Sequence, residues 1–435
     1  MKKIAVVMFD AGHIGGVLPY NLDLTYGLRE AGYEADLIFA VPKEQPDKAH
    51  GAKAGLGLRI HISKSGGRLF SENAIPYIGK KNSGELKEKL QEYDGVVLSK
   101  VPSWKRGHND DQDWLKALQH GKPMVCIVHD TLWLRSYPWI LSLRDKITYY
   151  VAVHPAAFSM AKLIPGRICC IVNPFDISKS QKTYEKDWNA LASTAFFRQW
   201  KHNEDGIRAV PYMKPVHLFQ TGAGIELSYM RAELKSKDKY SGSSYANYRK
   251  KIMQYRWKKS DYSYREKWDG KRIFDVAKKT GRFHYMGVVP PEELYNLKAG
   301  CGGSVDWSYH SWGEYFNRVT VEAMIYHCLP FARPTGIAGN ETGEGLVFGP
   351  ENVVLIREGL SPKKTGELIV SSMHDKALRK EMITRNLKKI EMFDRKVVAE
   401  QIVRALKGKE KVGLLETMTG KSNKKVRSYM EDFGE

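Results

Sequence analysis

Apolar residues in the first part of the chain form short runs of strand length, separated by longer stretches with helical spacing. The first run, IAVVMF at residues 4–9, leads into a glycine-containing loop. A helical stretch follows and ends near Gly32, and a second apolar run begins at Leu37. Strand, tight loop, helix and strand in this order predict the first unit of a doubly wound parallel sheet. Further strands are expected at residues 95–99, 124–129, 149–154 and 168–172.

A second series of alternating elements follows residues 172–177, which have the character of a linker because Pro174 disfavours helix at Asn173. Strands are expected at 216–220, 282–287 and 353–356, and helices at 318–327 and 361–405. The pattern predicts an α/β protein with two Rossmann-like, doubly wound domains. The expected boundaries are 1–173 for the first domain, 174–405 for the second and 406–435 for a basic C-terminal tail.

Residues 229–272 interrupt this alternation with a basic and aromatic insertion. Between Arg231 and Arg272 the chain has fourteen Lys or Arg and five Asp or Glu, a balance of +9 out of a total of +20. Six tyrosines and two tryptophans are interleaved with these charges. A charge excess of this size indicates a polyanionic partner, either nucleic acid or an acidic membrane surface. The alternative is a solvated insertion with no role.

Other features of composition narrow the class of protein. The 435 residues suffice for two domain cores, and no stretch approaches the run of about 20 apolar residues that a membrane-spanning helix needs. No signal peptide is recognisable at the N-terminus, so we expect a cytoplasmic protein, and a monomer. The five cysteines lack the spacing of metal ligands, which favours free buried thiols and no structural zinc.

The pair Glu314 and Glu322 carries the strongest chemical signal. Seven residues separate the two carboxylates, and Glu322 lies at the start of a predicted helix that leads to a strand containing proline. Carboxylates accept paired hydrogen bonds from vicinal diols, so this spacing can hold both a ribose and a hexose. Two solvated glutamates on an amphipathic helix are the alternative.

The residues around this pair resemble the E-x7-E motif of the retaining GT-B glycosyltransferases of family 4. The resemblance implies two domains that face a cleft, a UDP-sugar donor such as UDP-glucose, transfer with retention and no obligatory metal. It assigns the ribose to Glu322 and a place beside the donor sugar to Glu314. One departure is His327, which stands where the family usually has glycine and so puts the local backbone turn in question.

Four further segments resemble parts of the same family that bind the donor: an N-terminal glycine loop, an Arg-and-Lys motif, a loop at the interdomain cleft, and a segment whose backbone meets the uracil. Glycines let backbone amides approach the diphosphate, and cations neutralise it as the nucleotide departs. Ordinary surface charges are the alternative for the Arg-and-Lys motif. The residues that this likeness assigns are Gly15, Gly16, Arg198, Lys201, Gly222 and Val288.

A closer resemblance, to the phage DNA α-glucosyltransferases, extends over most of the chain. It rests on a VP-containing loop at 101–102, on the pair His129 and Asp130 after a predicted strand, and on the form of the helix start in VEAMIYHCLP. It implies that the pair lines the acceptor side of the donor sugar, where Asp130 accepts a hydrogen bond from the attacking hydroxyl. Asp10 is a second candidate for that role, and a buried structural histidine is the alternative for His129.

These likenesses lead to an expected function with two rivals. We expect transfer of a sugar, most simply glucose, to a hydroxymethylated pyrimidine such as hydroxymethylcytosine in double-stranded DNA, with the nucleotide flipped out of the duplex. A cell-envelope enzyme acting on a lipid or polysaccharide at an anionic membrane is the first rival, although residues 1–173 carry only +6 of the net charge. A non-enzymatic DNA-binding protein is the second, and the intact glutamates disfavour it. The residues expected to grip DNA phosphates are Arg249, Lys250, Lys251, Arg256, Lys258 and Lys259.

Overall fold

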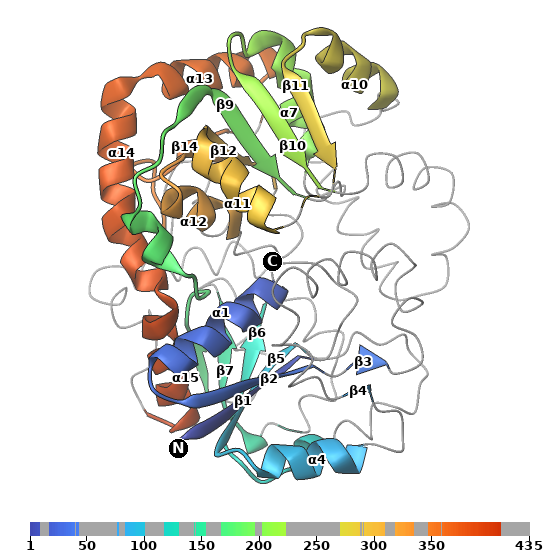
Figure 1. Ribbon diagram of the computed structural model, residues 1–435, viewed down its shortest axis with the longest axis vertical. Helices are drawn as coiled ribbons and strands as arrows, with labels where there is room; N and C mark the ends of the chain where they lie inside the picture. The colour runs from blue at the N-terminus through green and yellow to red at the C-terminus, as the bar shows by residue number, and fades with distance from the viewer. Residues whose placement is uncertain are drawn as a thin grey trace. The chain divides into compact units, whose positions relative to one another are not determined.

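The computed structural model divides the chain into two compact units (Figure 1). Unit 1 comprises Met1–Gln181 together with Lys389–Glu435, and unit 2 comprises Lys182–Lys388. The structure describes residues 1–8, 17–39, 41–42, 76–77, 83–100, 117–129, 143, 145–153, 167–195, 202–222, 270–287, 289, 291–308, 318–334, 347–357 and 359–409.

Unit 1 is built on a sheet of six parallel strands in the order β2-β1-β5-β6-β7-β8. The strand order reverses between β1 and β5, which makes the carboxyl ends of these two strands the switch point of the sheet. A short separate pair joins β3 (Val41–Pro42) to β4 (Pro76–Tyr77). The six strands are β1 (Lys3–Met8), β2 (Glu34–Phe39), β5 (Gly95–Lys100), β6 (Met124–Val128), β7 (Ile147–Ala152) and β8 (Ile168–Cys170).

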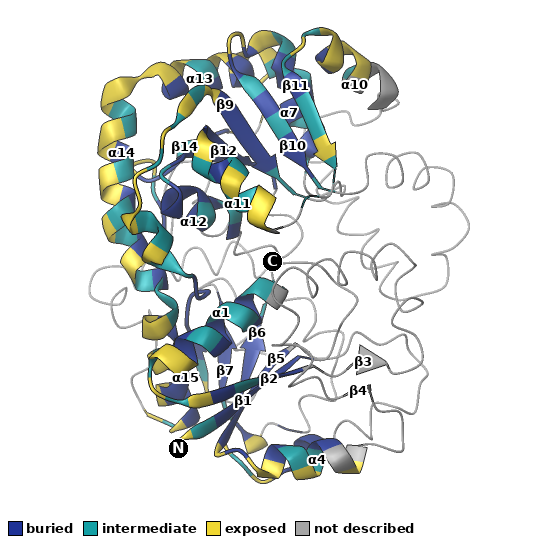
Figure 2. Cartoon of the chain, viewed as in Figure 1, coloured by how far each residue is buried: buried dark blue, intermediate teal, exposed yellow. Residues whose placement is uncertain are grey.

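Burial explains why these segments became strands. All five residues of β6 are buried, as are five of the six residues of β1, so neither strand shows an alternation of polar and apolar positions (Figure 2). Strands of a parallel sheet covered on both faces have this character. All five cysteines are free and buried, which confirms the predicted state of the thiols.

Helices from distant parts of the sequence complete unit 1. They are α1 (Val17–Glu30), α4 (Ser83–Gln91) and α15 (Arg395–Leu406), with short 3-10 helices η3 (Ile177–Gln181) and η8 (Ile390–Phe393). The last described helix, α15, packs along α1. Gly27 permits the close approach, because a Cβ atom there would lie 2.1 Å from the carbonyl oxygen of Arg395.

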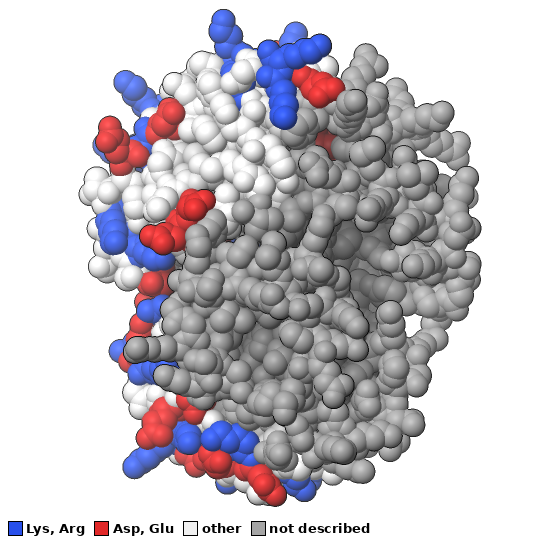
Figure 3. Space-filling model, turned by 45° about the vertical axis from the view of Figure 1, so that its right-hand side comes forward, with Lys and Arg blue, Asp and Glu red and all other residues white. Residues whose placement is uncertain are grey.

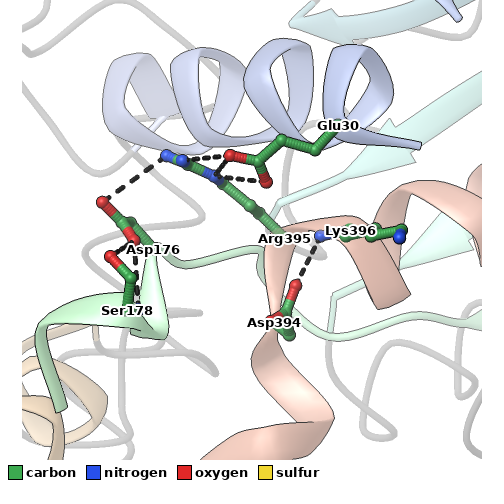
Figure 4. A network of polar contacts seen from close by, with 6 residues as sticks. All are labelled: Glu30, Asp176, Ser178, Asp394, Arg395 and Lys396. Atoms are coloured by element: carbon green, nitrogen blue, oxygen red, sulfur yellow. Dashed lines mark hydrogen bonds and ion pairs between the residues drawn. The ribbon is translucent and has the colours of Figure 1, made fainter. Parts of the chain in front are cut away.

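Arg395 fixes the start of α15 to two other segments of unit 1 (Figure 4). Its guanidinium donates to both carboxylate oxygens of Glu30 on α1 and lies 3.7 Å from Asp176. The backbone joins the same segments, since the Arg395 amide donates to the Phe175 carbonyl at 2.9 Å and the Phe175 amide donates to the Phe393 carbonyl at 2.8 Å. Two-pronged arginine–carboxylate pairs are directional as well as charged, so they define the position of the helix.

Unit 2 contains a second sheet of six parallel strands, in the order β11-β10-β9-β12-β13-β14. Numbered within the unit, this is the order 3-2-1-4-5-6 of dinucleotide-binding sheets, and the reversal lies between β9 and β12. The strands are β9 (Asp187–Thr194), β10 (His217–Thr221), β11 (Phe283–Gly287), β12 (Cys301–Asp306), β13 (Leu329–Ala332) and β14 (Val354–Leu355). The helices are α7 (Asn203–Ala209), η5 (Val210–Tyr212), α10 (Gly270–Lys279), α11 (Pro291–Gly300), α12 (Arg318–Ile325), α13 (Pro362–His374) and α14 (Lys376–Lys389). Two doubly wound α/β sheets confirm the predicted fold class.

The two strands at the switch point of unit 2, β9 and β12, are not among the predicted strands. β12 reads CGGSVD, which lacks the apolar run typical of a strand. Its glycines are required by packing, because a Cβ on Gly302 would lie 2.7 Å from the Trp188 ring and one on Gly303 would lie 2.8 Å from Leu191. Strand β12 is thus selected by close packing against β9 rather than by propensity.

The division into units differs from the boundaries expected at 173 and 405. The chain passes into unit 2 after Gln181, and the helical stretch predicted at 361–405 is three helices, of which α15 lies in unit 1. The amphipathic pattern of α15 predicts that one face of the helix is buried. It does not predict against which of the two sheets that face packs. Among the described residues no helix is both long and apolar enough to cross a membrane.

A buried histidine of unit 1 predicts how stability changes with pH. His120 accepts a hydrogen bond from the Lys122 amide through Nδ1 (3.1 Å), and burial, with the nearby charges of Lys122 and Lys87, lowers its pKa to about 4. The unfolded chain binds a proton near pH 6.5 and the folded chain does not, so stability is lost as pH falls below 6.5. We expect the free energy of unfolding to fall by about 2 kcal/mol from this group between pH 7.5 and pH 5.

Urea unfolding at the two pH values measures this effect in the wild type and in His120→Gln, which has no imidazole to titrate. The variant should lose about 2 kcal/mol of the wild-type pH dependence. His374→Gln is the matched control, because His374 is exposed at the end of α13. Equal pH dependence in the wild type and His120→Gln would show that His120 is not the titrating group.

Candidate functional site

The carboxyl edge of the unit 2 sheet has the topology of a ligand site. In a doubly wound sheet, ligands bind outside the carboxyl ends of the strands at the switch point, here β9 and β12. Strand β12 ends at Asp306, whose carboxylate accepts hydrogen bonds from the backbone amide (2.9 Å) and hydroxyl (2.7 Å) of Ser308 and so fixes the turn that follows. The next described element in the chain is α12, which carries Glu322.

Glu322 lies between two cations that come from different helices. Its Oε2 accepts a hydrogen bond from the ammonium of Lys298 on α11, and its Oε1 lies 3.5 Å from Nε of Arg318, one turn earlier on α12. The side chain of Lys298 is fully buried (0% exposed), whereas that of Glu322 retains 14% exposure. The carboxylate is therefore held from the protein side by a buried cation.

The charge state of Glu322 follows from a competition between burial and these cations. Burial alone would raise the pKa of the carboxyl group, but the charges and hydrogen bonds of Lys298 and Arg318 outweigh it and hold the pKa below its usual value. Glu322 is consequently ionised at neutral pH. An ionised and partly accessible carboxylate can accept the paired hydrogen bonds of a vicinal diol.

A second lysine, Lys186, holds the segment that joins α11 to β12. Lys186 donates to the carbonyl oxygens of Lys298 (2.7 Å) and Cys301 (3.0 Å), which lie at the junction of α11 and β12. Burial lowers the pKa of Lys186 and raises that of the neighbouring Cys328 thiol. Lys186 thus fixes the end of α11, from which Lys298 extends.

The turn after α12 forms although His327 stands where the resembling family usually has glycine. His327 has φ 57°, the left-handed conformation in which glycine is favoured. The amides of His327 and Cys328 donate to the carbonyls of Met324 (3.1 Å) and Ala323 (2.8 Å), as at other helix ends of this kind. The turn therefore has the conformation that glycine would adopt, and the imidazole packs edge-on against Tyr184 at 5.3 Å.

Substitution of His327 separates the strain of this turn from the contact of the ring. His327→Ala loses the ring and keeps the strained backbone, whereas His327→Gly loses both. We expect the glycine variant to be more stable than the alanine variant by about 1 kcal/mol, since a left-handed residue other than glycine costs about 1–2 kcal/mol. Chemical denaturation of the two variants measures this difference. Equal stabilities would show that the turn relaxes in the alanine variant.

A second buried ion pair lies at the carboxyl end of β13 in the same sheet. Arg333 follows β13 and pairs with Asp205 of α7. His202 precedes α7 with φ 44°, and its Nδ1 lies 3.6 Å from Glu204. Burial, with the charge of Arg333, holds the pKa of His202 well below its usual value, so this imidazole is neutral at pH 7. The start of α7 is thus joined to the carboxyl end of β13.

Gly222, predicted to line the nucleotide site, directly follows β10. Its φ is 121°, its amide donates to the Gly287 carbonyl (2.8 Å), and its own carbonyl accepts from the Tyr285 hydroxyl (2.8 Å). These bonds tie the ends of β10 and β11 together. Gly222 therefore shapes the backbone at this edge, and its amide is committed within the protein.

His129 lies at the carboxyl edge of the unit 1 sheet, directly after β6. Its Nε2 is 3.1 Å from the hydroxyl of Ser99 on β5, and its ring meets Tyr20 of α1 edge-on at 4.8 Å. Ser99 and Tyr20 are fully buried and His129 is partly exposed. These neighbours fix the ring at the edge where such sheets bind ligands.

The predicted site residues other than Glu322, Gly222 and His129 lie outside the described residues. His129 belongs to unit 1, whereas Glu322 and Gly222 belong to unit 2. Those outside are Asp10, Gly15, Gly16, Asp130, Arg198, Lys201, Arg249, Lys250, Lys251, Arg256, Lys258, Lys259, Val288 and Glu314.

Sequence reasoning missed both cations that hold Glu322. Arg318 had a recognisable signal, because it stands four residues before Glu322 on a predicted helix. Lys298 had none, since one lysine near the end of an amphipathic helix is ordinarily solvated. Within the part of the chain that the structure describes, no group of three or more His, Cys, Asp or Glu side chains is arranged to hold a metal ion.

A scan of the sequence against protein-family models finds no match, and a search of the curated proteins finds none either. The fold, in contrast, matches solved glycosyltransferases over nearly their whole length. Alr3699/HepE of Anabaena, in complex with UDP and glucose, matches with TM-score 0.60 at 15% identity, over 94% of this chain and 100% of that one. An alpha-glucosyltransferase in complex with UDP and a 13-mer DNA containing an HMU base matches with TM-score 0.62 at 14% identity, over 93% and 99%.

A glycosyltransferase from Rickettsia africae matches with TM-score 0.59 at 12% identity, over 94% of this chain and 99% of that one. At such identities the likeness shows the fold. The chain has the GT-B fold of these glycosyltransferases, with two Rossmann-like domains.

Proposed function

We propose that this protein is a glycosyltransferase that takes its sugar from a UDP-sugar, with UDP-glucose the first candidate. The observation that carries the proposal is the pairing of Glu322 on α12 with the buried Lys298, beside a sheet with the nucleotide-binding strand order. The similar structures support it, because they include glycosyltransferases in complex with UDP or UDP-glucose.

In this proposal unit 2 binds the nucleotide. Glu322 accepts hydrogen bonds from the two ribose hydroxyls, Val288 contributes backbone contacts to the uracil, and Glu314 lies beside the donor sugar. Arg198 and Lys201 neutralise the diphosphate as it leaves, since charge develops there in the transition state. Both cations follow β9 in sequence, and Glu314 follows β12, the two strands at the switch point.

The proposed acceptor is a hydroxymethylated pyrimidine in double-stranded DNA, of the kind found in phage DNA. A similar structure is an alpha-glucosyltransferase in complex with UDP and DNA containing an HMU base, which supports this choice over other hydroxyl acceptors. The hydroxyl would attack the anomeric carbon as the bond to UDP breaks, with Asp130 or Asp10 receiving its proton. The likeness to E-x7-E enzymes makes retention of configuration the expected outcome, and Gly15 and Gly16 would approach the diphosphate.

The distribution of charge favours DNA over a membrane acceptor. Figure 3 shows Lys and Arg interspersed with Asp and Glu over the described part of one face. The sequence between Arg231 and Arg272 holds nearly half of the net charge, and it contains Arg249, Lys250 and Lys251. Lysines and arginines that grip phosphates give binding that is independent of sequence and sensitive to salt.

Release of UDP in the presence of different acceptors tests the proposal. The protein is incubated with UDP-glucose and a duplex containing hydroxymethylated pyrimidines, the same duplex without them, or anionic phospholipid vesicles. We expect UDP release to rise only with the modified duplex. A rise with vesicles alone would favour the cell-envelope enzyme. Duplex binding without any UDP release from any UDP-sugar would favour the non-enzymatic protein.

A further inference from the structure

Among the lysines that the structure describes, Lys298 is unusual because no part of its side chain is exposed. Burying an ammonium group is expensive unless a partner compensates its charge. Its ammonium donates to Oε2 of Glu322, the residue to which the proposed function assigns the ribose. A buried lysine thus supports the described residue that is expected to bind the ribose.

The geometry leaves the carboxylate able to bind a ligand. Each carboxylate oxygen can accept about two hydrogen bonds, and Lys298 uses one at Oε2 while Arg318 lies beside Oε1. Lys298 is inaccessible and Glu322 is partly exposed, so the lysine cannot compete with the ligand for solvent-facing positions. The carboxylate is therefore fixed by a buried cation, while part of the Glu322 side chain remains exposed.

We propose that Lys298 is a positioning residue of the donor site, which holds the Glu322 carboxylate in place as a two-oxygen acceptor for the ribose diol. This inference rests on the proposed function, because it presumes that Glu322 binds the ribose. Lys298 does not touch the substrate in this proposal, but it determines how well Glu322 binds the ribose. A carboxylate that is ordered before binding loses less entropy when the diol arrives.

A purely structural pair is the competing explanation, and stability cannot distinguish the two. Replacing a buried ion pair by apolar residues is often neutral or stabilising. The dependence of ribose recognition on pH does distinguish them. Without Lys298, burial still disfavours the charged form of Glu322 and only Arg318 remains to oppose it. The carboxylate should then become protonated at a higher pH and lose its acceptor capacity there.

The other titratable groups around Glu322 do not produce this effect. Of the strands packed against α12, β13 has no titratable side chain and β12 carries Cys301 and Asp306. Helix α11 adds Glu292, Glu293 and Tyr295 besides Lys298. Lys186 lies behind Lys298, and Cys328, Tyr326 and His327 follow α12. Among these described groups, Lys298 and Arg318 are the ones whose charges act on the Glu322 carboxyl.

The test compares the affinities for UDP and for its 2′,3′-dideoxy analogue, by calorimetry from pH 5 to pH 8. Their ratio isolates the ribose hydroxyls, and titration of the diphosphate cancels between the two ligands. We expect the wild type to favour UDP by about 10–150-fold, the worth of a hydrogen bond to a charged group, at every pH. In Lys298→Met we expect a ratio about tenfold smaller at pH 8, which falls further as the pH is lowered to 5.

Lys363→Met is the control, because it removes an exposed lysine of unit 2 whose partner is Glu367. It should keep the wild-type ratio at each pH. If Lys298→Met does not fold, Lys298→Gln removes the charge and keeps a hydrogen-bond donor, and it should show the same loss at low pH.

The outcomes separate this inference from the proposed function. A wild type that binds both ligands equally would overturn the ribose role of Glu322 and the proposed donor site with it. A wild type that favours UDP, beside a Lys298 variant with the same ratio and the same pH profile, would overturn the role of Lys298 alone.

Discussion

Replacing Glu322 by alanine is expected to weaken UDP binding by about 1.5–3 kcal/mol, the range for hydrogen bonds to a charged group. It should also lower the free energy of unfolding by about 3–5 kcal/mol, because Lys298 would be left as an unpaired buried charge. Calorimetry with UDP and urea unfolding measure the two effects. The expectation of lost stability comes from the structure, since the sequence alone predicts a glutamate that matters only to the ligand.

A double variant separates the two losses. In Glu322→Ala with Lys298→Met, the buried ammonium group is removed together with its partner, so stability should largely return while UDP affinity stays low. Glu367→Ala is the matched control, because Glu367 is an exposed glutamate of unit 2 whose partner is the exposed Lys363. Unchanged UDP affinity in the folded double variant would remove Glu322 from the nucleotide site.

The second large effect is expected where α15 meets α1. In Gly27→Ala, one methyl group would have to occupy the place of the Arg395 carbonyl, which lies 2.1 Å from the ideal Cβ position. We expect a loss of about 3 kcal/mol in the free energy of unfolding, because backbone atoms cannot move aside as a side chain can. Intrinsic helix propensity acts in the opposite direction, since alanine favours helix over glycine.

The same substitution at Gly84 controls for helix propensity. Gly84 is an exposed residue in the first turn of α4, and a Cβ atom there would meet nothing within 4 Å. Gly84→Ala should therefore leave stability unchanged or raise it by a few tenths of a kcal/mol. If Gly27→Ala behaved like Gly84→Ala, the close packing of α15 on α1 would be contradicted.

The strands that are buried and apolar could be predicted from the sequence. Runs such as MVCIV at β6 and ITYYVA at β7 are legible because a parallel sheet covered on both faces needs continuous apolar strands. It was insufficient for β9 and β12, where the chain uses alanine and glycine so that neighbouring strands and Trp188 can approach closely. A strand made of small residues for close packing shows no hydrophobic pattern in the sequence.

The candidate site, too, could be predicted from the sequence only in part. Glu322 was found through its spacing from Glu314 and the residues around it, which are local properties of the chain. Lys298 reaches Glu322 from a different helix, 24 residues earlier in the sequence. Such a pair depends on how α11 and α12 pack on β12, which no local pattern encodes. The return of α15 to unit 1 is undetectable from sequence for a similar reason.

The central claim, transfer of a hexose from UDP-glucose to a hydroxymethylated pyrimidine in DNA, is tested most directly by the mass of the product. Duplex DNA with and without the modified base is incubated with the protein and UDP-glucose, digested to nucleosides and analysed by mass spectrometry. We predict one added hexosyl residue on the hydroxymethylated pyrimidine and none on any other nucleoside. Nucleosides that all keep their starting mass, in a reaction where the protein binds both UDP-glucose and the modified duplex, would contradict it.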